Sequence, residues 1–294
     1  MTPLPDMIQT AARASSLLHK EGTDAIIAFV QSQCNLDGGF RGRTQASDLY
    51  YTVFGQSCLI ALNQPSMKPP ADSFVAAAKP AELDFVHLAS AARCHCLTGH
   101  PDATNRSRPF LARMEAFRSR DGGYHHQLTH AAFGTVYGAF LAYLTYQEAG
   151  LQPPRLARLH ETLETFRTAD GGYANETGRQ QATATTTAAA ILIQYWISGI
   201  RDTRAAEMLL GFASRAGGFR AFANAPEPDL LSTATSVYAL RTIGDKYSLT
   251  VDYESFIELL WNDNGGFYGS LLDALPDVEY TFYALLALGC RTPI

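Results

Sequence analysis

The sequence lacks any cluster of basic residues, and charged residues occupy only 17% of its 294 positions. Lys and Arg together number 23 against 28 Asp and Glu, so the net charge is −5. Binding to nucleic acid or to an anionic membrane surface requires a dense positive surface, so this composition argues against both partners. The apolar content of 47% instead predicts a soluble globular chain with a large core.

Cysteine is scarce, and its spacing contains no CxxC pair. The five cysteines are Cys34, Cys58, Cys94, Cys96 and Cys290. An odd number without a metal-ligand spacing favours a reducing compartment over a disulfide framework, so we expect a cytoplasmic protein. Apolar runs such as Ala188–Ile193 are far too short for a transmembrane helix. The first twenty residues have no continuous apolar core and include Asp6, so no secretory signal is expected.

A pair of glycines followed by an aromatic residue recurs along the whole chain. The pairs begin at Gly38, Gly122, Gly171, Gly217 and Gly265. Their spacings are 84, 49, 46 and 48 residues, and the first is nearly twice the others. One unit has therefore lost its glycine pair, somewhere before Asp84. The sequence predicts six repeats of about 48 residues each.

Every repeat contains an amphipathic segment, the glycine turn, a polar loop and then a more apolar segment. The amphipathic segments are Thr23–Gln33, Ala71–Ala78, Arg108–Arg118, Arg155–Thr168, Thr203–Ser214 and Tyr253–Trp261. The apolar segments are Asp48–Leu62, Asp84–Leu97, His130–Tyr146, Gln181–Trp196, Asp229–Ile243 and Asp277–Leu288. Helical periodicity predicts outer helices for the first set and surrounded inner helices for the second.

These repeats predict one all-α domain over residues 1–294. An open array of hairpins would need polar end units, whereas the first and last repeats are as apolar as the others. We therefore expect six hairpins closed into a ring of inner and outer helices. Residues 1–20 should form one extra N-terminal helix, and Asn63–Pro80, which contains four prolines, should be the least regular stretch.

Four of the predicted inner helices begin with aspartate: Asp48, Asp84, Asp229 and Asp277. Aspartate is a favoured N-cap, and capping is the predicted role of Asp84, Asp229 and Asp277. The following turn contains residues that core packing does not select, among them His87 and Glu279. A structural histidine and an acid, base or metal-binding histidine remain equally open readings of His87.

Aromatic residues on the inner segments can line an apolar cavity with a few polar groups at its rim. They include Tyr50, Tyr51, Phe54, Tyr137 and Phe282. His125, His126 and His130 follow the second glycine pair without a nearby carboxylate or thiolate, and we interpret them as part of a polar loop.

The chain resembles the family of protein prenyltransferase β subunits and squalene-type cyclases, whose fold is an α/α toroid of six helical hairpins. The resemblance covers nearly the whole chain through its Gly-Gly-aromatic turns. It is sharpest in Gly38-Gly39-Phe40-Arg41-Gly42-Arg43, in Asp48-Leu49-Tyr50-Tyr51 and in Asp84-Phe85-Val86-His87. In the β subunits, the corresponding motifs contain the Asp, Cys and His ligands of a catalytic zinc.

The resemblance implies catalytic positions at Asp48, Tyr50 and His87, with Asp48 and His87 as zinc ligands. Tyr50 occupies the position of the family's cysteine, so we expect zinc to bind weakly compared with a complete site. Glu279 is the nearest substitute ligand that the sequence offers.

The predicted substrate-binding group consists of Arg43, Tyr51, Phe54, Asp277, Glu279 and Tyr280. Arg43 and Tyr51 match residues that contact diphosphate in the family. Asp277 matches the family's diphosphate-binding histidine, in the repeat that ring closure should place beside the first one. Without a cation between them, Asp277 and Glu279 would repel a diphosphate.

Three functions follow as hypotheses. The first is a prenyl (alkyl) transferase that binds an isoprenoid or its diphosphate and transfers it to an acceptor, such as a peptide, with or without a helical α-type partner subunit. The second is a non-catalytic toroid that binds an isoprenoid or a peptide. The third is a terpene cyclase in which buried Glu279 or Asp277 acts as the acid, because the acidic motif of the family's cyclases is absent from Asp229-Leu230-Leu231-Ser232.

Overall fold

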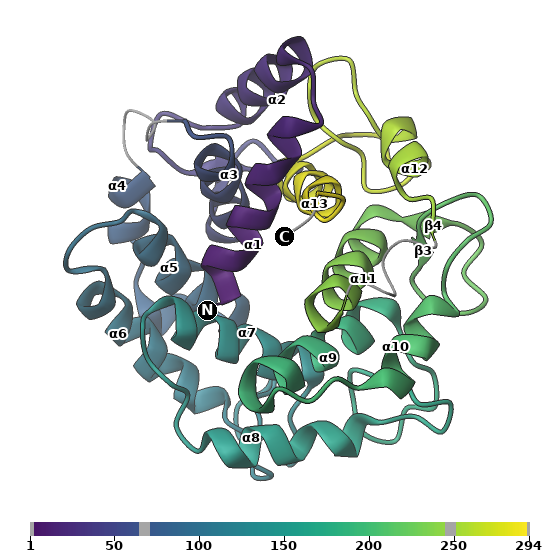
Figure 1. Cartoon of the computed structure of the whole chain (residues 1–294). Helices are drawn as coiled ribbons and strands as arrows, with labels where there is room; N and C mark the ends of the chain where they lie inside the picture. The colour runs from purple at the N-terminus through teal and green to yellow at the C-terminus, as the bar shows by residue number, and fades with distance from the viewer. Residues whose placement is uncertain (1–2, 65–70, 245–250, 293–294) are drawn as a thin grey trace. The chain divides into compact units, whose positions relative to one another are not determined.

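The computed structural model describes residues 3–64, 71–244 and 251–292, and the regular secondary structure within these ranges is helical apart from two short strand pairs (Figure 1). The chain forms two compact units. Unit 1 comprises Met1–Glu115, Leu144–Leu151 and Leu260–Ile294, and unit 2 comprises Ala116–Tyr143 and Gln152–Leu259. None of the described helices has the length and apolar character that a membrane-spanning helix requires.

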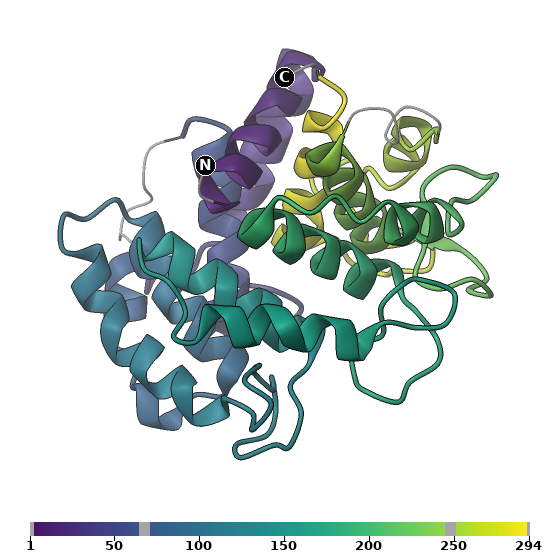
Figure 2. The same ribbon diagram turned by 60° about the horizontal axis from the view of Figure 1, so that its bottom comes forward.

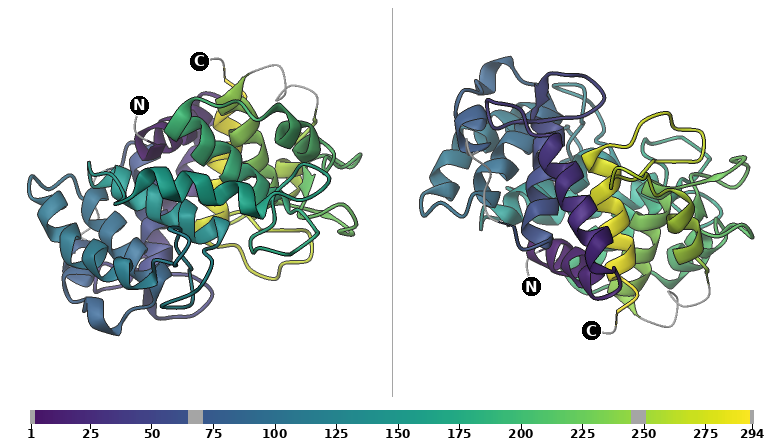
Figure 3. Two further views of the ribbon diagram at one scale, coloured as in Figure 1. Left: turned by 90° about the horizontal axis from the view of Figure 1, so that it is seen from below. Right: turned by 90° about the horizontal axis from the view of Figure 1, so that it is seen from above.

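Unit 1 is built around three inner helices that are buried on most sides. Its helices are α1 (Pro3–Ala12), η1 (Arg13–Ser16), α2 (Lys20–Ser32), α3 (Leu49–Ala61), α4 (Ala71–Ala76), η2 (Pro80–Glu82), α5 (Phe85–Leu97), α6 (Ala103–Met114) and α13 (Val278–Gly289). Helix α3 packs between α5 and α13, and α1 lies along α13 (Figure 3). Gly289 permits this close approach, because a Cβ atom there would overlap the carbonyl oxygen of Thr10. The predicted adjacency of the first and last repeats is thus confirmed.

Unit 2 continues the alternation of outer and inner helices. It contains α8 (Leu156–Thr162), η4 (Leu163–Phe166), α9 (Ala184–Ser198), α10 (Thr203–Leu210), α11 (Leu230–Ile243) and α12 (Glu254–Leu259). Helix α7 (Val136–Glu148) begins in unit 2 and ends in unit 1, and η3 (Glu115–Phe117) also crosses the boundary. The inner helices α9 and α11 run side by side (Figure 2).

The glycine turns have the backbone conformation that their sequence predicts. The first glycine of each pair has a φ between 88° and 103°, a region that is strained for residues with a side chain. The aromatic residue then pairs with the start of the inner helix: strand β1 (Phe40–Arg41) pairs with β2 (Ser47–Asp48), and β3 (Phe219–Arg220) with β4 (Pro228–Asp229). These short antiparallel pairs connect two of the glycine turns to the helices that follow them.

A threonine four residues after the capping aspartate completes this connection. The Thr52 Oγ1 atom accepts a hydrogen bond from the Phe40 amide at 2.9 Å and donates one to the Asp48 carbonyl oxygen at 2.6 Å. Thr233 makes the same two bonds after the third glycine turn of unit 2, and Thr281 after the last turn in unit 1. The fixed distance of this threonine from the aspartate is a sequence signal for the connection.

The aspartates cap their helices. The side chains of Asp84, Asp229 and Asp277 accept hydrogen bonds from the amides of His87, Ser232 and Tyr280. The predicted capping role of these residues is therefore confirmed. By contrast, the predicted helix start at His130 is wrong: His130 lies in a loop with a φ of 60°, and α7 begins at Val136.

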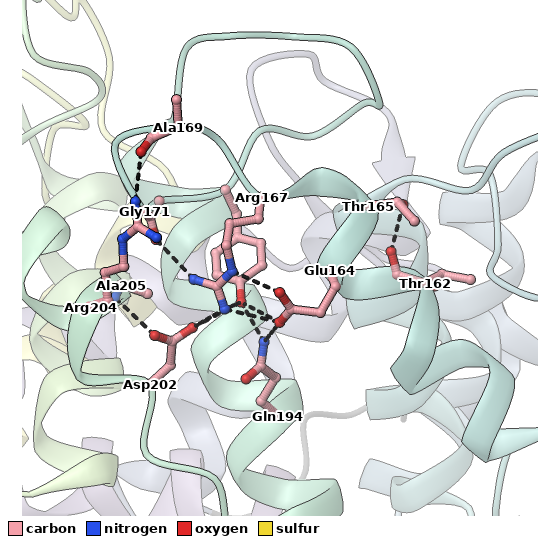
Figure 4. A network of polar contacts seen from close by, with 12 residues as sticks. Thr162, Glu164, Thr165, Arg167, Ala169, Gly171, Gln194, Asp202, Arg204 and Ala205 are labelled. Carbon is pink, nitrogen blue, oxygen red and sulfur yellow. Dashed lines mark hydrogen bonds and ion pairs between the residues drawn. The ribbon is translucent and has the colours of Figure 1, made fainter.

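A polar network connects successive repeats of unit 2 (Figure 4). Arg167 binds both oxygens of Glu164, at 2.8 and 2.9 Å, and donates to Asp202 at 2.7 Å. It also donates to the carbonyl oxygen of Gly171 in the glycine turn. The buried Tyr173 hydroxyl donates to Asp202 at 2.9 Å, and Asp202 in turn caps α10. The network satisfies its buried polar groups and so stabilises the turn against the next helix.

Candidate functional site

The residues predicted to form a site come together within unit 1, at the N-terminal ends of α3, α5 and α13. Asp48 caps α3 through hydrogen bonds from the amides of Tyr50 and Tyr51, at 2.8 and 3.2 Å. Its second carboxylate oxygen lies 3.1 Å from Nε2 of His87 on α5. The first turns of α3 and α5 thereby place Asp48 and His87 in direct contact, as the sequence motifs imply.

His87 is bound on both sides of its ring by carboxylates. Its Nδ1 atom lies 2.9 Å from Asp84, and its Nε2 atom contacts Asp48. The hydrogen bond to Asp48, supported by the bond to Asp84, raises the pKa of His87 to about 9. Burial alone would raise the pKa of Asp48, but the bonds from His87 and two amides lower it. At neutral pH the group is therefore an imidazolium between two carboxylates.

A zinc ion does not fit this donor set. Catalytic zinc sites use three protein ligands and structural sites use four. Asp48 and Asp84 contact opposite nitrogens of the His87 ring and so do not form one ligand set with it. The part of the chain that the structure describes contains no group of three His, Cys, Asp or Glu side chains able to hold a metal. Tyr50, in the cysteine position, directs its hydroxyl to Glu279. No chemical step at this site is therefore assigned to a metal.

Glu279 on α13 provides a buried carboxyl group to the site. Its Oε1 atom accepts a hydrogen bond of 2.5 Å from the Tyr50 hydroxyl, and the residue is only 9% exposed. Burial raises the pKa of Glu279 to about 7, although the Tyr50 hydroxyl and nearby Arg43 act in the opposite direction. A carboxyl group with this pKa can both donate and accept a proton near neutral pH.

Arg43 forms the rim of the site in the loop between β1 and β2. Its guanidinium group binds both oxygens of Asp273, at 3.2 and 3.3 Å, and its Nε atom donates to Asp277 at 3.3 Å. The hydrogen bonds to Asp273 are the main cause of the raised pKa of Arg43. Arg43 also lies over the ring of Tyr280, at 5.6 Å from its centre. Its charge is thus already partnered.

Asp273 was not predicted, because it lies in the loop before α13 without a recognisable motif. Its carboxylate also accepts a hydrogen bond from the Gly269 amide at 3.0 Å, which holds the loop in place. Asp277 is only 1% exposed, and burial raises its pKa despite the cap and the Arg43 contact.

Tyr51 packs tightly against the loop that carries Arg43. A Cβ atom at Gly42 would overlap the Tyr51 ring, so a glycine is required there. Burial, followed by the charges of Asp277 and Glu279, raises the pKa of Tyr51 to about 12. Tyr51 is therefore a neutral hydrogen-bonding group at the rim.

Below these polar groups lies an aromatic cluster, defined by Tyr50, Phe54, Phe282 and Tyr283. Ring centres are 5.0 Å apart for Tyr50 and Phe54 and 5.5 to 5.8 Å apart for Phe54 and its two partners on α13. Such edge-to-face and tilted contacts are favourable arrangements of aromatic rings. The site thus combines a layer of aromatic rings with the Glu279 carboxyl group and a charged rim.

Replacing His87 with Gln is expected to change how stability depends on pH. The pKa of His87 lies above its ordinary value of 6.5, so its stabilising contribution is complete below pH 6.5 and is lost as the pH rises through about 9. The variant should therefore be less stable than the wild type at pH 6, and the difference should vanish by pH 10. Urea unfolding at several pH values measures it, and a difference independent of pH would contradict the assignment of an imidazolium.

Comparison with known proteins agrees with this fold and repeat structure. The prenyltransferase alpha-alpha toroid domain family matches residues 11–193, 115–249 and 186–290. The chain therefore belongs to this family, and the predicted α/α toroid fold class is confirmed. A search of curated proteins found no significant match.

Several solved structures share the fold at low sequence identity. Protein geranylgeranyltransferase-I of Candida albicans, complexed with GGPP, is 13% identical with a TM-score of 0.57, and the match covers 90% of this chain and 82% of that one. A variant of the type II terpene cyclase MstE of Scytonema, in complex with geranylgeranyl dihydroxybenzoate, is also 13% identical with a TM-score of 0.57, over 96% and 97%. A glycosidase variant is 13% identical with a TM-score of 0.59, over 95% and 97%.

Proposed function

We propose that this protein is an enzyme that binds an uncharged isoprenoid and transfers a proton to or from it at Glu279. The observation that carries the proposal is the buried Glu279 carboxyl, hydrogen-bonded to Tyr50 at 2.5 Å beside the aromatic cluster. A carboxyl with a pKa of about 7 suits proton exchange with an oxygen function or an activated double bond of the substrate. This corresponds to the cyclase hypothesis, with Glu279 as the acid.

The charges around Glu279 favour an uncharged substrate over a diphosphate. Each of the two cations is bound by two aspartates. Arg43 is bound by Asp273 and Asp277. His87 is bound by Asp48 and Asp84. A multiply charged anion would have to displace Asp273 from Arg43 and would meet the remaining carboxylates at short range. Coulomb repulsion at partly buried positions costs several kcal/mol at an effective dielectric constant of about 20.

The aromatic cluster supports an isoprenoid as the substrate. Phe54 and Phe282 are largely buried, whereas Tyr50 and Tyr283 keep part of their surface accessible. Each Å² of apolar substrate surface that such rings cover stabilises binding by about 25 cal/mol before association costs. The solved structures with this fold include proteins complexed with GGPP and with geranylgeranyl dihydroxybenzoate, which is consistent with the proposal.

Prenyl transfer from a diphosphate is the second candidate. It is favoured by Arg43 and Tyr51, which lie together at the rim in the motif positions that contact diphosphate in the family. In that case Arg43 would exchange Asp273 for the diphosphate, and Glu279 would accept the proton of the acceptor. A toroid that binds an isoprenoid or a peptide without catalysis remains the third alternative.

Calorimetry with a fifteen-carbon isoprenoid alcohol and its diphosphate distinguishes these functions. We expect the wild type to bind the alcohol at least as tightly as the diphosphate. Asp273→Asn removes one negative charge beside Arg43 and makes its terminal nitrogens easier to displace, although Asp277 still binds Nε. It should therefore strengthen diphosphate binding by about 1.5–3 kcal/mol, the range for a hydrogen bond to a charged group, without changing alcohol binding. Arg43→Ala should leave alcohol binding unchanged.

Asp263→Asn is the matched control, because Asp263 is an exposed aspartate of the same unit outside the site. A wild type that prefers the diphosphate, and loses this preference in Arg43→Ala, would favour prenyl transfer. Absence of binding for both ligands would remove the isoprenoid from both proposals and leave peptide binding as the better hypothesis.

A further inference from the structure

Unit 2 contains a cavity of about 320 Å³ at the N-terminal ends of α7 and α9. Its lining residues are Tyr137, Asn175, Thr183, Thr185, Thr186 and Ala189. The volume lies at the lower end of the range of about 300–1,000 Å³ that is typical of small-molecule sites. No side chain of this lining carries a charge.

Asn175 presents hydrogen-bond donors to this cavity. Its Oδ1 atom accepts a bond of 2.9 Å from the Tyr137 amide, and its carbonyl oxygen accepts one of 3.1 Å from the Val136 amide. Because a backbone amide can only donate, these contacts fix the orientation of the Asn175 side-chain amide. Its Nδ2 group has no hydrogen-bond partner among the residues that the structure describes, and it remains available to a ligand.

The threonines add an acceptor and a second donor. Thr186 uses its hydroxyl proton on the carbonyl oxygen of Tyr173, at 2.6 Å. In the 2.6 Å contact between Thr183 and Thr186, the donor is therefore Thr183, which leaves a lone pair of Thr183 as an acceptor. The Thr185 hydroxyl lies 3.5 Å from Thr183, too far for a strong bond, so it can donate or accept.

The Tyr137 ring and Ala189 form the remaining part of the lining. The Tyr137 ring packs edge-to-face against His126, with ring centres 5.3 Å apart, and His126 is held by Thr135 at 3.0 Å. Burial lowers the pKa of His126, so the group behind the Tyr137 ring is neutral at physiological pH. On α9, Ala189 leaves space where a larger side chain would fill the cavity.

We propose that this cavity is a binding site for an uncharged monocyclic phenol or alcohol. The ring of the ligand lies against Tyr137 and Ala189, and its hydroxyl group donates to Thr183 while it accepts from Asn175 or Thr185. The lining offers hydrogen-bond donors to an anion but no positive charge. It offers a cation no carboxylate, and the carboxamide oxygen of Asn175 already accepts a bond from the Tyr137 amide. The proposal rests on unit 2 alone and stands independently of the function proposed for unit 1.

Ligand-observed NMR on the full-length protein tests this site with phenol, cyclohexanol, benzoate and glucose as probes. Phenol and cyclohexanol should bind, and benzoate and glucose should bind at least tenfold more weakly. Asn175→Asp keeps the oxygen that accepts from the Tyr137 amide but removes both donors and adds a charge. It should weaken phenol binding at least tenfold. Ala189→Leu fills the cavity and should abolish binding of both probes.

Ala132→Leu is the matched control, because Ala132 is an exposed alanine outside the lining, and it should bind phenol like the wild type. If Ala189→Leu does not fold, Thr185→Val retains the shape of the side chain and should still weaken phenol several-fold. Unchanged phenol affinity in Asn175→Asp and Thr185→Val would overturn the proposal. So would tighter binding of benzoate than of phenol, or binding of glucose alone.

Discussion

Glu279→Gln is expected to lower turnover of the isoprenoid by about 10²- to 10⁴-fold, the usual contribution of a positioned acid or base. Glutamine retains the size of the side chain and can still accept the Tyr50 hydroxyl bond, so the loss would reflect the proton and not the packing. Product formation measured with the substrate identified by the binding experiment gives this ratio. Glu258→Gln changes an exposed glutamate outside the site and should retain full activity.

Tyr50→Phe tests what the Tyr50 hydroxyl contributes to the Glu279 carboxyl group. The Tyr50 hydroxyl lowers the pKa of Glu279 against the larger effect of burial, so its removal should raise that pKa above about 7. The pH profile of turnover should then shift to higher pH while the reaction continues. A profile that is unchanged in Tyr50→Phe, or full activity in Glu279→Gln, would show that Glu279 is not the proton-transferring group.

Protonation of Glu279 should also change how the stability of the protein depends on pH. Because the pKa of Glu279 lies above its ordinary value of 4.5, the folded state holds a proton that the unfolded state has released between pH 4.5 and about 7. Stability should fall across this window as the pH rises. Glu279→Gln removes this fall, and at pH 8 it should gain about 3 kcal/mol relative to the wild type, at 1.36 kcal/mol per pKa unit. This result does not depend on knowing the substrate.

Arg93→Ala is expected to cause the largest loss of stability, about 3–5 kcal/mol. The Nε atom of Arg93 lies 3.0 Å from each carboxylate oxygen of Glu148, whose side chain is 0% exposed. Burial raises the pKa of Glu148 in spite of this contact. Without Arg93, the carboxylate would remain buried without its partner. Chemical denaturation at pH 7 measures the change.

Two comparisons identify the buried charge as the cause. Arg93→Met preserves most of the packing volume and should still destabilise the protein by a similar amount, with partial relief at low pH, where Glu148 can take up a proton. Arg158→Ala breaks an ion pair with Glu161, whose side chains are 69% and 60% exposed, and should cost less than about 1 kcal/mol. Equal losses in Arg93→Ala and Arg158→Ala would contradict this assignment.

The sequence by itself determined the repeats, the helices and the capping aspartates. Glycine pairs require positive φ, and an aspartate before an apolar run stabilises a helix start, so these features depend on short stretches of chain. The helix start at His130 was mistaken, because that residue adopts a positive φ in a loop whose hydrogen bonds run from Arg120 and Asp121 to Ala131 and Ala132. The apolar pattern of the sequence does not predict such a loop.

Only the tertiary structure decided what the site residues do. Tyr50 and Glu279 are 229 positions apart in sequence, and Arg43 and Asp273 are 230 apart. Their pairing depends on the packing of α3 against α13, and burial there places the pKa of Glu279 near 7. Likewise, His87 became a cation because Asp48 and Asp84 approach it from two different helix starts. The Asp84 contact belongs to a local motif, but burial and the contacts between residues remote in sequence do not, and these set most of the charge of each group.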